Sequence, residues 1–189
     1  KYNKTIFALS TPKQKSALAV FRISGKDSYK AISKITGNKK IKPFKTNLVK
    51  IYNNNKEIID QTITVFYKAP KSYTGEDLVE ISCHGGLATI KKITSLLIET
   101  GLRPAEPGEF TKRSLLNDKI NINQAESIND LVNSETESQR KIAIRNLNGD
   151  LDNYIQELTK KITKIIADTE AIIDFADEDL PKEILKKVI

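Results

Sequence analysis

The only cysteine and the only histidine of the chain, Cys83 and His84, are adjacent in the stretch SYTGEDLVEISCHGG, residues 72–86. A thiol beside an imidazole could form a nucleophile–base pair, and both groups are metal ligands. The alternation of the stretch predicts a strand, in which successive side chains point to opposite faces. Cys83 then shares an apolar face with Val79 and Ile81, where cysteine acts as a small hydrophobic residue. His84 points the other way, so the pattern argues against a catalytic Cys–His pair.

A metal site is not expected either. One cysteine, one histidine and scattered acids lack the spacing of three or four close ligands that zinc requires. His84 precedes Gly85 and Gly86, which favours a residue at the end of a strand that bonds to a loop.

Glu80 falls on the face of this strand that also carries Leu78 and Ser82. A carboxylate in the middle of a strand is costly to bury unless something pairs with it. Glu80 is therefore either exposed on a half-open sheet or a carboxylate that faces a ligand. In the second case Arg22, on another alternating strand, would supply the opposite charge.

The elements that must position these residues are strands mixed with helices up to about residue 106, and helices after it. The predicted strands cover 5–10, 18–25, two segments of 47–70 joined at an Asn-rich turn, and 77–84. The predicted helices of this part cover 27–37 and 87–101, each ending at a glycine, with a short helical pattern after Pro107 and Gly108.

The rest of the chain has helical spacing. Ser134-x-x-Glu137 is typical of a capping box at the start of a long helix. Apolar residues at steps of three or four from Leu147 to Ile172 predict one helix that continues past Gly149 and packs on other helices. The acids and proline of 174–183 are expected to end it, before a further helix begins. The predicted fold class is α+β, with a mixed α/β domain at 1–118 and a helical segment at 119–189.

Composition narrows the class of protein. The 189 residues are 39% hydrophobic and 29% charged, which is typical of a globular chain. No apolar run is long enough to span a bilayer, and no signal peptide opens the chain. A single cysteine cannot form an internal disulfide, so we expect a cytoplasmic protein without a membrane partner.

The net charge of +7 is unevenly distributed. Residues 1–50 hold 13 Lys and Arg against one acid, whereas 51–189 hold 18 Lys and Arg against 23 acids. Such a split indicates either a surface that faces nucleic acid or a lysine-rich composition without a role. The lysines show neither aromatic interleaving nor a known RNA motif, so both interpretations stay open.

Several stretches together resemble one family, the tRNA modification GTPases known as MnmE or TrmE. They occur in the family's order and cover nearly the whole chain: TIFALSTP, AVFRISG, SYTGEDLVEISCHGG, RPAEPGEFTKRSLLNDKINI with QAESINDLV, and AIIDFADED. The spacings TGED-x-x-E-x-x-x-HGG and RPAEPGEFT-x-R are the most specific. The chain resembles the N-terminal domain and the first part of the helical domain of these proteins.

The resemblance implies an N-terminal fold similar to tetrahydrofolate-binding domains, a homodimer formed through it, and a site for 5-formyl- or 5,10-methylene-tetrahydrofolate. The family's folate-contacting residues correspond to Arg22, Glu80 and Lys119; no catalytic residue is carried over. One carboxylate can accept the ring N–H and the exocyclic amine of a pterin, which suits Glu80. Arg22 and Lys119 would then serve the ring carbonyl or the anionic glutamyl tail.

The resemblance also implies what this chain lacks. The family hydrolyses GTP, with Mg²⁺ and K⁺, in a domain built round a Gly-x-x-x-x-Gly-Lys-Ser/Thr loop, and no such pattern occurs here. The family's C-terminal cysteine motif is absent too, and Cys83 does not take over its role. We therefore expect a fragment that binds folate and dimerises without hydrolysing GTP or modifying tRNA by itself.

In the intact protein the resemblance implies wobble-uridine modification of tRNA, of the carboxymethylaminomethyl type, with the flavin-dependent partner MnmG. The alternative is a basic tRNA-docking module without a folate ligand. A stand-alone folate-dependent aminomethyltransferase is a third interpretation, based on the analogy of fold alone. The helical tail is too short for the second domain of such enzymes.

Overall fold

The computed structural model describes residues 4–174 and shows an α+β fold, in which a mixed sheet with helices precedes a purely helical part. The chain divides between Ile120 and Asn121 into two units, and each is described by itself below. The sequence pattern predicts this boundary at residue 118, two residues earlier.

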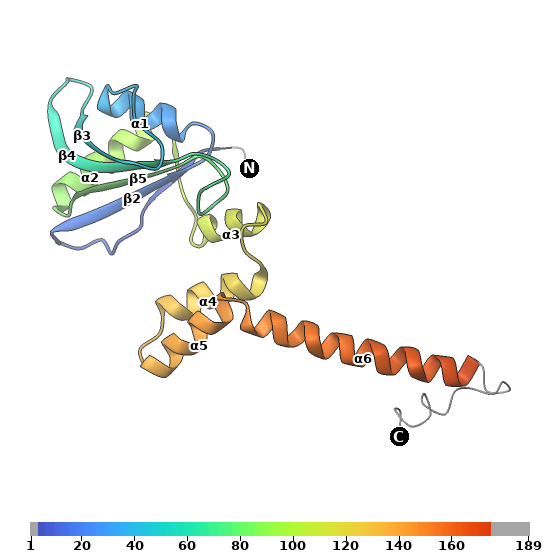
Figure 1. Ribbon diagram of the computed structural model, residues 1–189. Coiled ribbons are helices and arrows are strands. Elements are labelled where there is room, and N and C mark those ends of the chain that lie inside the picture. The colour runs from blue at the N-terminus through green and yellow to red at the C-terminus, as the bar shows by residue number, and fades with distance from the viewer. Residues whose placement is uncertain (1–3, 175–189) are drawn as a thin grey trace. The chain divides into compact units, whose positions relative to one another are not determined.

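The sheet of the first unit has the strand order β3-β4-β5-β2-β1-β6. Figure 1 labels its strands β2 to β5. Neighbouring strands are antiparallel, except that β1 and β6 are parallel. The strands are β1 (Ile6–Leu9), β2 (Leu18–Ser24), β3 (Thr46–Tyr52), β4 (Ile58–Tyr67), β5 (Leu78–His84) and β6 (Arg103–Pro104). The first five confirm the predicted strands, and the two-residue β6 was not predicted.

Three helices belong to this unit: α1 (Ser28–Thr36), α2 (Leu87–Glu99) and α3 (Glu109–Leu116). The apolar sides of α1 and α2 join one face of the sheet in a single core, which contains Ile32, Ile93, Phe21, Ile81 and other buried residues. Strand alternation explains this arrangement, because every second residue of β2 and β5 faces the helices. The opposite face is not covered by α1 or α2, and it is called the open face below.

The second unit contains α4 (Ile122–Val132), α5 (Glu137–Leu147) and α6 (Asp150–Asp174) in its described part. Asn121 begins α4 with a capping box in which Gln124 returns the hydrogen bond. Two sequence predictions are wrong here. The capping box of α5 starts at Thr136 and uses Gln139, rather than Ser134 and Glu137.

The predicted continuous helix through Gly149 is also wrong. Gly149 has φ +93°, in the left-handed region that favours glycine, and it separates α5 from α6. No residue of α6 is buried within the described chain, so its apolar stripe does not pack in the expected way. The predicted helix end at 174–183 and the helix after it lie outside the described residues.

A search of residues 4–174 finds no helix with both the length and the apolar character needed to cross a membrane.

Candidate functional site

Arg22 and Glu80 form an ion pair on the open face. Strands β2 and β5 are antiparallel neighbours, and their register places Arg22 directly opposite Glu80. Nε and Nη2 of Arg22 both donate to Oε1 of Glu80, at 2.9 and 2.6 Å. Each side chain is 27% exposed. The structure thus brings together two of the three residues that the resemblance indicated, in a partly buried pair.

Aromatic rings surround this pair. The guanidinium carbon of Arg22 lies 5.1 Å from the ring centre of Tyr73 and 5.7 Å from that of Phe110, within the range of cation–π attraction. Burial, and then the charge and hydrogen bond of the Glu80 carboxylate, raise the pKa of Tyr67. A cation and an anion therefore share a surface with three flat side chains.

Helix α3 holds the loop between β4 and β5 that carries Tyr73. The hydroxyl of Ser114 donates to the carbonyl of Tyr73 at 2.7 Å, and the Tyr73 hydroxyl lies 2.9 Å from Oγ1 of Thr111. The side-chain amide of Asn117 donates to the carbonyl of Thr74 at 2.6 Å. These bonds hold Tyr73 at its backbone carbonyl and at its hydroxyl, and they join the two sequence motifs in space.

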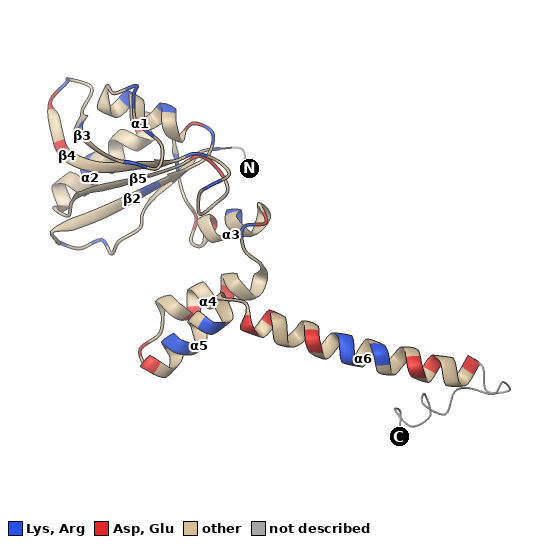
Figure 2. Ribbon diagram, in the orientation of Figure 1, with Lys and Arg blue, Asp and Glu red and all other residues tan. Residues whose placement is uncertain are grey.

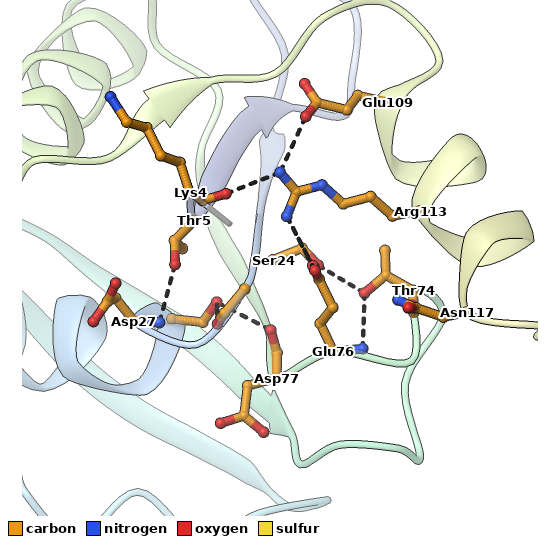
Figure 3. Close-up of polar contacts among 12 residues, drawn as sticks. Lys4, Thr5, Ser24, Asp27, Thr74, Glu76, Asp77, Glu109, Arg113 and Asn117 are labelled. Atoms are coloured by element: carbon orange, nitrogen blue, oxygen red, sulfur yellow. Dashed lines mark hydrogen bonds and ion pairs between the residues drawn. The ribbon is translucent and has the colours of Figure 1, made fainter. Parts of the chain in front are cut away.

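The same helix is anchored by a buried arginine (Figure 3). Arg113 is 2% exposed, and its Nη1 donates to Oε2 of Glu76 at 2.9 Å. Its Nη2 donates to Oε1 of Glu109 at 3.0 Å and to the carbonyl of Lys4 at 2.9 Å. Glu76 also accepts from the hydroxyl of Ser24 on β2. One guanidinium therefore connects α3, the Tyr73 loop and the start of the chain.

Glu109 is the most perturbed acid of this network. Burial by itself raises the pKa of its carboxyl, since it disfavours the charged form. Hydrogen bonds from Arg103, from the backbone N–H of Glu106 and from Arg113 outweigh burial and lower the pKa of Glu109 to about 2. The side chain of Glu109 is 4% exposed, so its ion pair with Arg113 lies away from solvent and serves the fold.

Lys119, the third residue indicated by the resemblance, is exposed beside the Tyr73 loop. Gly75 has φ +75°, and a Cβ built there would lie 3.2 Å from Cγ of Lys119, so the stem of the lysine packs closely on this glycine. Among the described residues, no hydrogen bond or ion pair joins Lys119 to Arg22 or Glu80. The structure places it near the loop without bringing it into the pair.

Cys83 and His84 do not form a catalytic pair. Cys83 is 1% exposed in the core, and burial, followed by the charge of Asp60, raises the pKa of its thiol to about 11. The ring of His84 points to the other side, where Nδ1 lies 2.7 Å from Oδ1 of Asp60. His84 thus bonds to β4 rather than to the loop we expected. Within residues 4–174 no group of three or more His, Cys, Asp or Glu could hold a metal ion.

Comparison with known proteins assigns the chain to a family. The model of the N-terminus of the GTP-binding protein TrmE matches residues 5–119, and that of the MnmE helical domain matches 122–189. The chain belongs to the MnmE/TrmE family.

Curated relatives named tRNA modification GTPase MnmE agree with this membership. The protein of Thermotoga maritima is 42% identical over 175 residues, 92% of this chain and 39% of its own length. That of Campylobacter curvus is 39% identical over 186 residues, 98% of this chain and 42% of the relative. The Aquifex aeolicus protein is 40% identical over 185 residues, covering 97% and 41%. The chain thus spans about two fifths of the length of these MnmE proteins.

Sequence reasoning missed Tyr67, Tyr73 and Phe110. Tyr73 and Phe110 lie inside the two motifs that indicated the MnmE/TrmE family, which was the available signal. Their contact with Arg22 could not be anticipated, since it depends on α3 lying next to the loop after β4. The role of Arg113 was missed because nothing in the local sequence marks an arginine as buried.

Proposed function

We propose that this chain is the N-terminal part of a tRNA modification GTPase, in which the first unit binds a one-carbon tetrahydrofolate and forms a homodimer. Family membership and the names of the relatives support the tRNA-modifying role. The observation that carries the folate proposal is the Arg22–Glu80 pair, bordered by Tyr67, Tyr73 and Phe110.

The donors and acceptors of this surface fit a pterin. A pterin is flat, so it can stack against aromatic side chains. It presents a ring N–H beside an exocyclic amine, and one carboxylate can accept both. Glu80 is the acid available at this position, and Arg22 is the cation beside it. The residue types therefore match the group.

The present bonding of the pair has a consequence for binding. Both donors of Arg22 occupy the same oxygen of Glu80, Oε1. A carboxylate oxygen offers about two lone pairs, so a two-pronged contact with both oxygens requires Arg22 to give up at least one of these bonds. Arg22 would then be free to serve the ring carbonyl or the glutamyl tail of the ligand.

The other residues of the site orient the ligand or hold the side chains that contact it. Lys119 is exposed at the rim, where its ammonium group can meet the anionic glutamyl tail. Helix α3 holds Tyr73 in place through Ser114 and Thr111. The bound folate supplies a one-carbon unit, and these residues orient the molecule that carries it.

The open face also supports the homodimer. Leu48 and Ile63 are opposite each other on β3 and β4, and their side chains are 67% and 47% exposed. Leu18 of β2 is 63% exposed. Exposed apolar residues gathered on one sheet face are typical of protein interfaces. We propose that two copies meet through this face.

The remaining activities are proposed for the longer protein. The 189 residues contain no Gly-x-x-x-x-Gly-Lys-Ser/Thr pattern, so we expect GTP hydrolysis, with its Mg²⁺ and K⁺, to require a domain beyond them. The proposed reaction is wobble-uridine modification of tRNA in the cytoplasm, together with MnmG.

Isothermal titration of the 189-residue chain with 5-formyltetrahydrofolate tests the proposal. We expect saturable binding that Glu80→Ala weakens by roughly tenfold or more, because the ring donors lose a charged acceptor. The matched control is Glu57→Ala, in the exposed turn between β3 and β4. No heat with folded wild-type protein, or equal losses in both variants, would refute the folate site. Light scattering at several concentrations tests the dimer.

A further inference from the structure

A hollow lined by lysines lies on the helix-covered side of the first unit. Its volume is about 490 Å³, and its lining includes Lys4, Lys26, Lys30 and Lys34 with one acid, Asp27. The wall opposite α1 is formed by the turn after α2, around Gly101. All four lysines are exposed. We call this feature the lysine groove.

The lysine groove continues into a second hollow. This one has a volume of about 440 Å³ and shares Lys34 and Thr100 with the first. It adds Lys56, from the turn between β3 and β4, and one further acid, Glu99. The carboxylate of Glu99 accepts a hydrogen bond from Asn54. Lys34 thus lines both hollows, and Lys56 adds one further cation past the C-terminal end of α1.

These lysines do not serve the fold through ion pairs. Lys4, Lys26, Lys30 and Lys34 form no ion pair with any described residue. Figure 2 shows blue residues on α1, which are Lys30 and Lys34, and the helix contains no acid. Lys30 and Lys34 lie four residues apart on this helix, and like charges at that spacing repel each other.

In the second unit, some lysines form ion pairs within their own helix. There Lys141 and Lys161 each lie four residues from a glutamate, and both form ion pairs. On α1, by contrast, Lys30 and Lys34 lie four residues apart and the helix contains no acid that could pair with them. Repulsion of this kind is relieved when an anionic partner binds.

The lysine groove and the Arg22–Glu80 pair lie on opposite faces of the sheet. Phe21 and Ile23 belong to the core with α1 and α2, so Arg22 between them points to the open face. The lysines of α1 lie beyond the helix layer on the other side. A ligand in the lysine groove and a ligand at Glu80 can therefore be bound at the same time.

We propose that the lysine groove docks the phosphate backbone of tRNA. Lys30 and Lys34 are about 6 Å apart along the helix axis, so the side chains form a row of cations that can meet a row of phosphates. The groove is concave, so it fits the raised phosphate backbone of a nucleic acid better than it fits a flat membrane surface. The choice of this groove rests on its charge and shape, whereas naming tRNA as the polyanion rests on the proposed function.

Fluorescence anisotropy with labelled tRNA, at several salt concentrations, tests this inference on the 189-residue chain. The groove variant combines Lys26→Gln, Lys30→Gln and Lys34→Gln. The matched control combines Lys13→Gln, Lys15→Gln and Lys50→Gln, three exposed lysines of residues 1–50 outside the groove, with the same change of charge. We expect the groove variant to lose roughly tenfold or more in affinity and to reduce the salt slope by about 2–3.

The control should retain nearly wild-type affinity. Equal losses in both variants, or no binding by the wild type, would overturn the inference. Binding of anionic phospholipid vesicles, but not of tRNA, through the groove lysines would overturn it as well. Folate titration of the wild type is read separately. If the wild type binds tRNA but not folate, the folate site is refuted and the lysine groove stands. If the wild type binds folate but not tRNA, the lysine groove is refuted and the folate site stands.

Discussion

Arg22 donates twice to a single oxygen of Glu80 from the directly opposed position on the neighbouring strand. At 27% exposure each, the two side chains remain in contact with solvent. Ion pairs of this kind contribute only about 0–1 kcal/mol to stability. The pair can therefore be exchanged for contacts with a ligand at little cost to the fold.

Replacement of Glu80 by glutamine should lower the pKa of Tyr67. Burial raises that pKa first, but the carboxylate adds to it by repelling the phenolate. The variant removes this repulsion and leaves Arg22, which favours the phenolate, without its partner. NMR titration of ring-labelled tyrosine measures the change, with Glu57→Gln as the control. A Tyr67 titration that is the same in wild type and Glu80→Gln would contradict the assigned contact.

Replacement of Arg113 by methionine should destabilise the protein by about 3–5 kcal/mol, because Glu76 loses its cation and the buried Glu109 keeps only Arg103. Urea unfolding measures the loss. The control is Arg140→Met, whose partner Glu137 is 62% exposed, and it should cost less than about 1 kcal/mol. Adding Glu76→Gln to Arg113→Met should recover part of the loss, because it removes the charge that has lost its partner. Equal costs for the two arginines would contradict the buried network.

Stability should fall in acid in a way that depends on Glu109. Its folded-state pKa of about 2 is below the ordinary value of 4.5, so its ionised form stabilises the fold above about pH 4.5. That contribution is lost as the pH falls from about 4.5 towards 2. Urea midpoints across this range should change less in Glu109→Gln than in wild type. Glu137→Gln, at an exposed ion pair, should keep the wild-type profile closely.

The thiol of Cys83 should be inert in the native state. With a pKa of about 11, raised first by burial and then by Asp60, the thiolate fraction at pH 8 is on the order of one in a thousand. A disulfide reagent such as DTNB should release one equivalent per chain in urea and almost none from folded protein. Rapid labelling of the folded chain would show that Cys83 is accessible.

Strand alternation predicted which faces carry the site residues. The pattern of β2 and β5 put Arg22 and Glu80 apart from the core residues, and the structure confirms it. The alternation could not predict the register in which β2 pairs with β5. Because β2 and β5 are distant in sequence, their pairing is set by long-range packing, and only that pairing makes Arg22 and Glu80 direct neighbours.

The errors in the helical part have local causes. Ser134-x-x-Glu137 and Thr136-x-x-Gln139 both fit a capping box, and the hydroxyl of Ser134 instead bonds to Leu131. The apolar spacing predicts a helix that tolerates Gly149, but the left-handed φ of this residue is a conformation that the sequence does not reveal. The aromatic surroundings of Arg22 were missed because Phe110 of α3 is distant in sequence and approaches Arg22 only in the folded chain.

The attachment of α3 determines where a minimal excised fragment can end. The last strand finishes at Pro104, so a cut soon afterwards would appear to keep the whole sheet. Such a cut removes Arg113 and leaves the carboxylate of Glu76 and the carbonyl of Lys4 without their shared donor. Tyr73 would also lose both of its tethers. A deletion series should therefore give a cooperatively folded piece only when the chain extends to Ile120.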